Sequence, residues 1–288
     1  MRAVHILWWG KPYPKQYQAY LDKWAVVDPQ LKVILWTDVM LLEVMSREYP
    51  QFVQFYKGLD DGGRSGFLEV TDFGRLMVLH HAGGVYADTD IEPMRSVLPL
   101  LEEAERKGEF VLGWEPREHA KIYDERPICN CFMISPKGHE YPLAMMNWIV
   151  EHYDASRGAV KNTGPVAMKC MYDSTGLRAT ESDGRRPAGI DPYRKVRIVE
   201  NDMFMPVTAG YNARSQTVPG YNDAEGVWHP PRVIPSVANG SDLSTAYTIH
   251  HWKFHPMGAA YHSHKEKIAP AVLVVGMFGL FMGLALSR

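Results

Sequence analysis

The stretch GGVYADTD, residues 83–90, places two aspartates directly after a short run that is typical of a β-strand. Gly83 and Gly84 are suited to ending a preceding helix, and residues 85–87 then form a short apolar strand. Asp88 and Asp90 follow at its carboxyl end, where open α/β sheets bind ligands. Side chains two residues apart on a strand share a face, so the two carboxylates are expected to point the same way if the strand continues.

The flanking sequence predicts an α/β fold with a mostly parallel central sheet. Residues 67–82 carry apolar side chains at helical spacing, and the glycine-rich residues 62–66 predict a mobile loop before that helix. Upstream, strand and helix patterns alternate, which favours a parallel sheet. The expected strands are residues 3–9 and 32–37, and the expected helices are residues 14–27 and 38–49. One catalytic domain is expected over residues 1–262, although the order of elements beyond residue 100 is not predicted.

Two neighbouring carboxylates repel each other unless a cation lies near them. Oxygen ligands of this kind suit Mg²⁺ or Mn²⁺, which complete their coordination with water and substrate phosphates. A nucleotide diphosphate would supply such phosphates. For an isolated D-x-D sequence the alternative is a solvated turn at the end of a strand, with no ligand.

The longer stretch TDFGRLMVLHHAGGVYADTDIEP, residues 71–93, resembles the signature of glycosyltransferase family 32, a family of D-x-D sugar-binding glycosyltransferases. The signature combines an Asp and an Arg on a helix with a Gly-Gly, a Tyr and the D-x-D. The matching positions are Asp72, Arg75, Gly83, Gly84, Tyr86, Asp88 and Asp90.

Segments on both sides of this signature are also similar to the family. VHILWWGKP resembles its opening strand and places Trp8 beside the nucleotide base, and two middle segments match around Asn130 and Gly164. AYTIHHWKF resembles a late element that supplies a histidine near the metal, which is His250 here. Many members continue with Gly-Ser-Trp, whereas this chain has KFHPM, so His250 and His255 are the alternatives for that role.

The resemblance implies a GT-A-type, Rossmann-like domain that uses Mn²⁺ or Mg²⁺ and a UDP- or GDP-hexose and that retains the anomeric configuration. Asp90 would bind the metal directly, with Asp88 and His250 beside it, while Asp88 would also contact sugar and ribose hydroxyls. The donor-binding and catalytic set that it implies is Trp8, Asp72, Arg75, Tyr86, Asp88 and Asp90. Asp72 and Arg75, three residues apart on one helix, could alternatively form only an intrahelical ion pair.

The family includes enzymes that mannosylate inositol-phosphoceramide and others that galactosylate glycolipids, so a membrane glycolipid is one expected acceptor. A glycoprotein or a polysaccharide remains an alternative acceptor. Two other classes of function also remain: a catalytically silent, membrane-tethered protein that binds sugar nucleotides, and a metal-dependent phosphohydrolase. The formal net charge is only -2 and the basic residues are scattered, which argues against nucleic-acid binding.

The last part of the sequence predicts a single-pass membrane anchor. Residues 268–286 are 19 uncharged, mostly apolar residues, which as a helix would span roughly 28 Å. Lys265 and Lys267 precede them and favour a cytosolic catalytic domain, whereas many family members work in the Golgi or ER lumen. Asn239 begins an N-G-S sequence that can be glycosylated only in the lumen.

Overall fold

The computed structural model describes residues 2–8, 13, 15–60, 63–123, 125–174, 195–207, 214–218, 220–222, 226–238 and 241–251. Within these ranges no helix is long and apolar enough to cross a membrane. The anchor predicted at residues 268–286 lies outside the described residues, as do His255 and Asn239.

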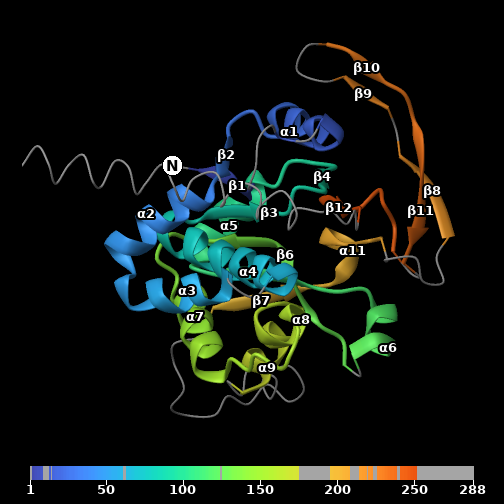
Figure 1. The fold of residues 1–288 in the computed structure, drawn as a ribbon. Helices are drawn as coiled ribbons and strands as arrows, with labels where there is room; N and C mark the ends of the chain where they lie inside the picture. Colours follow the sequence, from blue (N-terminus) through green and yellow to red (C-terminus); the bar gives the residue numbers. More distant parts are fainter. Residues whose placement is uncertain are drawn as a thin grey trace, which may run out of the picture.

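A six-stranded sheet forms the centre of the molecule (Figure 1). Its order is β2 (Lys32–Trp36), β1 (Ala3–Leu7), β3 (Gly84–Ala87), β6 (Ile128–Ser135), β5 (Phe110–Trp114) and β7 (Val196–Val199). Neighbouring strands pair in parallel except at β6, which runs antiparallel to both β3 and β5. The prediction of an α/β fold with a mostly parallel sheet is therefore confirmed.

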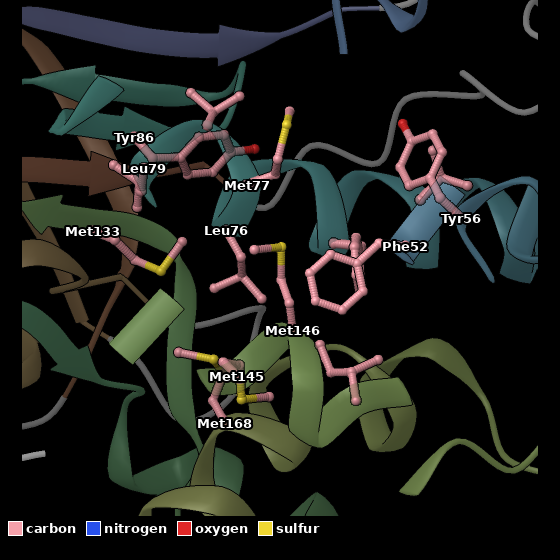
Figure 2. Packing of buried hydrophobic residues seen from close by; sticks show 14 of the residues in the cluster. Phe52, Tyr56, Leu76, Met77, Leu79, Tyr86, Met133, Met145, Met146 and Met168 are labelled. Carbon is pink, nitrogen blue, oxygen red and sulfur yellow. The ribbon is translucent and has the colours of Figure 1, made fainter. Parts of the chain in front are cut away.

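Helices cover both faces of the sheet and bury a separate apolar cluster on each. One face carries α2 (Asp38–Glu48), α3 (Val53–Asp60), α4 (Gly63–Ala82), α7 (Glu140–His152) and α9 (Pro165–Ser174), and the other carries α1 (Lys15–Val27) and α5 (Leu98–Lys107). Figure 2 shows Leu76 of α4 facing Met145 and Met146 of α7. Flexible methionine side chains fill such irregular spaces well. The shorter helices are η1 (Pro50–Phe52), η2 (Arg117–His119), α6 (Ala120–Tyr123), α8 (Ala159–Asn162) and α11 (Asn201–Phe204).

The first half of the chain follows the predicted order, with small differences at the element ends and with two helices, η1 and α3, that were not predicted. Strand β2 ends at Trp36 because Thr37 caps α2, its hydroxyl accepting a hydrogen bond from the backbone N–H of Met40 at 3.3 Å. The loop predicted at residues 62–66 was wrong, since α4 already begins at Gly63. Glycine weakens a helix by about 1 kcal/mol, but burial of Phe67 and Val70 in the next turns outweighs that cost.

Both glycines between α4 and β3 are required by the backbone. Gly83 and Gly84 have φ angles of 68° and 94°, which side-chain-bearing residues rarely adopt. A Cβ on Gly84 would lie 2.6 Å from the carbonyl oxygen of Ala3, and one on Gly83 would lie 2.5 Å from the backbone nitrogen of Lys137. The Gly-Gly pair thus lets the helix end abruptly and lets β3 enter the centre of the sheet.

The C-terminal elements lie outside the main sheet. Strand β4 (Ile91–Pro93) pairs antiparallel with β12 (Thr248–His250), which brings the end of the described chain back to the D-x-D segment. Two further strand pairs are β8 (Arg214–Val218) with β11 (Arg232–Val237) and β9 (Tyr221–Asn222) with β10 (Trp228–His229). These four strands form an arm that extends away from the sheet in Figure 1.

Candidate active site

Asp88 and Asp90 lie at the carboxyl end of β3, as predicted, but not on a continuing strand. The strand ends at Ala87, and the backbone N–H of Ile91 bonds to the carbonyl of Asp88 at 3.0 Å to close a turn. The expectation of two carboxylates on one strand face is therefore wrong in its geometry. The turn redirects the chain into β4, and it still leaves both carboxylates close together.

The histidine predicted near the metal joins these aspartates. His250 is the last residue of β12 and pairs with Ile91, so its ring lies beside the D-x-D turn. Its Nε2 is 3.2 Å from Oδ1 of Asp90. Burial opposes protonation of His250, but the carboxylates of Asp90 and Asp88 outweigh this effect and raise its pKa.

Asp88, Asp90 and His250 each offer one ligand atom, and these atoms lie within 4.8 Å of one another. Two carboxylate oxygens and one imidazole nitrogen form a donor set that suits Mn²⁺ or Mg²⁺, with positions left for phosphate oxygens and water. The carboxylates of Asp88 and Asp90 lie close together and favour positive charge at this point, the same effect that raises the pKa of His250. The described residues therefore fit a divalent cation here.

Asp72 projects from α4 toward the same site and is almost fully buried. Its Oδ1 accepts a hydrogen bond from the amide of Asn130 at 2.8 Å, and its Oδ2 accepts one from the hydroxyl of Thr163 at 2.8 Å. Burial raises the pKa of Asp72 to about 6, although Arg75 and these donors favour the ionised form. Asp72 is thus a carboxylate in a fixed orientation.

Arg75 lies between Asp72 and Asp88. Its guanidinium nitrogens are 3.1 Å from Oδ1 of Asp72 and 3.2 Å from Oδ1 of Asp88, and it also donates to the carbonyl of Asn130 at 2.7 Å. The ring of Tyr86 lies 4.8 Å below the guanidinium, and its hydroxyl donates to Oδ1 of Asp88 at 2.6 Å. Asp72, Arg75 and Asp88 are called the Arg75 cluster below.

The Arg75 cluster contains two carboxylates and one guanidinium. Burial raises the pKa of Asp88, with Arg75 and His250 acting in the opposite direction. The single guanidinium of Arg75 cannot fully compensate the two buried carboxylates. The cluster therefore favours the approach of a further positive charge. The intrahelical pair of Asp72 and Arg75 exists, as the simpler sequence interpretation expected, but it forms part of a larger arrangement that includes Asp88.

Trp8 lies at the end of β1, next to β3 in the sheet, so it is at the same edge as the D-x-D turn. It is buried, and its ring meets that of Tyr13 edge-to-face at 5.2 Å between centroids. Burial first, and then the charges of Tyr17 and Asp90, raise the pKa of the Tyr13 hydroxyl. The role of Trp8 at a nucleotide base stays a prediction that this position permits.

Sequence reasoning missed a second group of charges behind the site. The carboxylate of Glu92 on β4 is 2.7 Å from Nζ of Lys23 and 2.8 Å from Nε2 of His251, and it also binds Arg232. Burial disfavours its charge, but His251, Lys23 and Arg232 lower its pKa to about 2. The ring of Tyr20 stacks on His251 at 4.9 Å. Glu92 with Lys23, Arg232 and His251 is called the Glu92 cluster.

A buried Glu–His pair at the end of β5 was also missed. Oε2 of Glu115 lies 2.7 Å from Nδ1 of His119, and both side chains are almost inaccessible to solvent. The charge of Glu115 also contributes to the raised pKa of His250. Its signal in the sequence was only a glutamate that follows the apolar run FVLGW, residues 110–114, which is a pattern that many proteins contain.

An α/β sheet with two aspartates and a histidine at its edge is the arrangement expected of a D-x-D glycosyltransferase, and comparison of sequences agrees. Residues 14–107 match the family described as "Glycosyltransferase sugar-binding region containing DXD motif". This segment holds Asp72, Arg75, Asp88 and Asp90, so the resemblance inferred from the sequence is confirmed over these residues.

Two curated relatives are yeast proteins. The chain is similar to "Mannosyl phosphorylinositol ceramide synthase SUR1" of Saccharomyces cerevisiae, 31% identical over 100 residues, which cover 35% of this chain and 25% of that protein. It is also similar to "Inositol phosphoceramide mannosyltransferase 1" of Schizosaccharomyces pombe, 27% identical over 106 residues, covering 36% of this chain and 32% of the relative. The matches thus span about a quarter to a third of the relatives' length.

Solved structures of two glycosyltransferases are also similar to this chain. "PaToxG Glycosyltransferase" is 18% identical with a TM-score of 0.44, over 62% of this chain and 74% of that chain. A glycosyltransferase involved in glycosylation of the major capsid of PBCV-1 is 10% identical with a TM-score of 0.40, over 92% of this chain and 99% of that chain.

Proposed function

We propose that this protein is a metal-dependent glycosyltransferase that moves a hexose from a UDP- or GDP-sugar to an acceptor. The observation that carries the proposal is the convergence of Asp88, Asp90 and His250 within 4.8 Å, with the two aspartates inside the segment that matches the D-x-D family. Mannose is the first donor sugar to test, because both yeast relatives are named for mannosyl products or transfer.

In this proposal Asp90, Asp88 and His250 hold a divalent cation, which supplies Lewis-acid stabilisation of the diphosphate as it departs. The chain's own contribution is to fix the donors. Tyr86 and Arg75 both bind Oδ1 of Asp88, so its Oδ2 can face a ligand, in keeping with a side chain that is 26% exposed. Asn130 and Thr163 hold Asp72 in the same way. Preorganised groups of this kind need no rearrangement during the reaction.

We also propose that the anomeric configuration is retained through front-face attack. The bond between the anomeric carbon and the leaving phosphate oxygen breaks while the acceptor oxygen bonds to the same face of that carbon. The acceptor's hydroxyl proton passes to the departing phosphate oxygen, so no additional protein base is needed. The arrangement of the Arg75 cluster supports this route. Arg75 pairs with both Asp72 and Asp88, so neither carboxylate is free to attack the anomeric carbon as a nucleophile.

A membrane glycolipid, such as inositol-phosphoceramide, is the acceptor class that we propose. The names of the yeast relatives support this class, as does the apolar segment 268–286, which we propose as a C-terminal anchor. An enzyme held at a bilayer meets a lipid substrate at a raised effective concentration. Lys265 and Lys267 support a cytosolic catalytic domain. A glycosidase-sensitive mobility shift that Asn239→Gln abolishes would instead place the domain in the lumen.

The central experiment is a screen of nucleotide-sugars with the purified full chain, with Mn²⁺ or Mg²⁺ and after chelation. Release of free sugar and nucleotide diphosphate from one donor, dependent on the cation, is the expected result. Phosphate release from nucleotides without sugar release would identify a phosphohydrolase instead. Thermal stabilisation by a nucleotide-sugar without any turnover would identify a silent binding protein.

A further inference from the structure

The arm, defined as residues 214–218, 220–222 and 226–237, exposes three large apolar side chains. Val227, Trp228 and Val233 are 57%, 58% and 62% exposed, and they lie within seven residues of sequence. Isolated exposed apolar residues are common on proteins, but three of them on one short stretch of a projecting element (Figure 1) favour a contact surface. Val227, Trp228 and Val233 are called the arm patch.

The arm itself holds the patch in place. At its root, Ile234 and Val237 of β11 point inward and pack with Val207, Leu243 and Ile249 in a small core. Val233, next to Ile234 on the strand, therefore faces the opposite way, toward solvent. Trp228 covers Gly220 so closely that a Cβ on that glycine would collide with its ring. The exposed tryptophan is thus supported by its neighbouring strand rather than by the body of the protein.

We propose that the arm patch inserts into the interface of a lipid bilayer, the same bilayer that residues 268–286 would enter. Ile249 belongs to the core at the root of the arm, and the described chain ends two residues later at His251. Residues 252–267 then connect this root to the apolar run and can span at most about 55 Å. The bilayer is therefore within reach of the arm, and tryptophan is enriched at membrane interfaces.

The same geometry links the arm to the candidate active site. Strand β12 carries Ile249, which packs at the root of the arm, and His250, which faces Asp90. Arg232 of the arm also binds Glu92, two residues after Asp90. With the arm patch in the bilayer and the tail embedded, the protein would have two separate membrane contacts, which would restrict its tilt and fix the position of the site over a lipid acceptor. This orientation rests on the proposed anchor and acceptor.

The test uses the full chain reconstituted in phosphatidylcholine vesicles, with an environment-sensitive fluorophore on Trp228→Cys. The matched control is Val39→Cys on α2, where the native side chain is also 58% exposed. Cys170 is exposed and is replaced by serine in both, whereas Cys129 and Cys131 are buried. The label at 228 should shift to shorter wavelength and be quenched by lipid-borne quenchers, while the label at 39 should remain unquenched.

Equal quenching at the two positions, or none at 228, would overturn the proposal. A shift at 228 that grows with protein concentration and persists without lipid would also overturn it, in favour of contact with a second copy of the chain. Because the fluorescence signal does not depend on sugar transfer, it remains interpretable even if the proposed enzymatic function fails.

A second measurement separates orientation from catalysis. The double variant Trp228→Ser/Val233→Ser should lower transfer to a vesicle-borne acceptor by about tenfold, because an interfacial contact of this size is lost. Metal-dependent donor hydrolysis should stay unchanged, and Val39→Ser should affect neither rate. An equal fall in both rates would show that the arm patch supports the fold rather than a membrane contact, and would contradict the proposal.

Discussion

Two buried carboxylate clusters lie on either side of the D-x-D turn, and they have opposite charge balances. In the Arg75 cluster, Asp72 and Asp88 share one guanidinium, and the pKa of Asp72 rises to about 6. In the Glu92 cluster, a single carboxylate faces two cations and a histidine, and its pKa falls to about 2. Burial raises the pKa of both carboxylates, so the difference comes from the number of cations around each.

This contrast separates the proposed binding site from a cluster that connects structural elements. A cluster with excess negative charge can accept a metal ion, and its carboxylates can bind the hydroxyls of a sugar. A carboxylate whose oxygens are already paired with cations has few positions free to bind a ligand. The Glu92 cluster instead joins α1, β4, β11 and the end of β12, which holds His250 beside Asp90.

The largest expected effect comes from removing the charge of Asp90, which lies beside Asp88 of the Arg75 cluster. Asp90→Asn should lower metal-dependent transfer by at least about 100-fold, because a metal ligand is lost where charge develops in the transition state. The melting temperature should change little, since relief of the repulsion with Asp88 offsets loss of the ion pair with His250. Transfer rates over a Mn²⁺ titration, together with thermal unfolding, measure both effects.

Two further variants serve as a comparison and a control for Asp90→Asn. His250→Ala should weaken Mn²⁺ dependence less than Asp90→Asn does, and the surface variant Glu43→Gln on α2, where the native side chain is 72% exposed, should leave activity unchanged. Activity of Asp90→Asn within about threefold of wild type at limiting Mn²⁺ would refute its role as a ligand.

In the Glu92 cluster, removal of the carboxylate is expected to lower the stability of the fold rather than the activity. Glu92→Gln should lower the free energy of unfolding by about 3 kcal/mol, because it leaves Lys23 and Arg232 buried or half-buried without their anion. Glu103→Gln is the control, since Glu103 pairs with Lys107 and Arg197 near the surface, where solvent screens the charges, so its loss should be much smaller than that of Glu92→Gln. Urea unfolding at neutral pH compares the two variants. A similar loss in both would mean that the Glu92 cluster is not a structural connection.

The smallest expected effect is a difference in pH dependence. The pKa of Glu92 is lowered, so its stabilisation is complete above pH 4.5 and is lost as the pH falls toward 2. The pKa of Asp72 is raised, so stability is greatest below pH 3.8 and is lost as the pH rises through about 6. Relative to Asp72→Asn, the wild type should lose about 2–3 kcal/mol between about pH 4 and pH 7. Unfolding series at several pH values measure this, and a flat difference would contradict the buried charge at Asp72.

The sequence predicted those parts of the molecule that depend on short-range pattern. The elements from β1 to β3 alternate with clear periodicity, and the Gly-Gly and D-x-D residues lie within eight positions of one another. The signature also predicted Asp72 and Arg75 near this turn, the late segment AYTIHHWKF predicted His250 there, and the structure brings all three to it.

Other features depend on contacts between distant segments, and no local pattern reveals them. Thr163 binds Asp72 from 91 residues away, and Glu92 meets Lys23, Arg232 and His251 at separations of 69, 140 and 159 residues. The antiparallel insertion of β6 and the pairing of β4 with β12 are likewise decided by the whole fold. The loop predicted at 62–66 was wrong because burial of the following turns outweighed the local preference of glycine.

The pairing of β4 with β12 also sets the order in which the site can be completed during synthesis. All six strands of the central sheet lie within residues 3–199, so a growing chain can assemble its sheet before β12 leaves the ribosome. His250 reaches Asp90 only when that last strand docks, across a loop of more than 150 residues. Closing so long a loop costs little more entropy than closing a short one. A nascent chain would therefore be unable to bind its cation through His250 until β12 has been synthesised and has paired with β4. Binding of the cation through His250 would mark the end of this stage of synthesis.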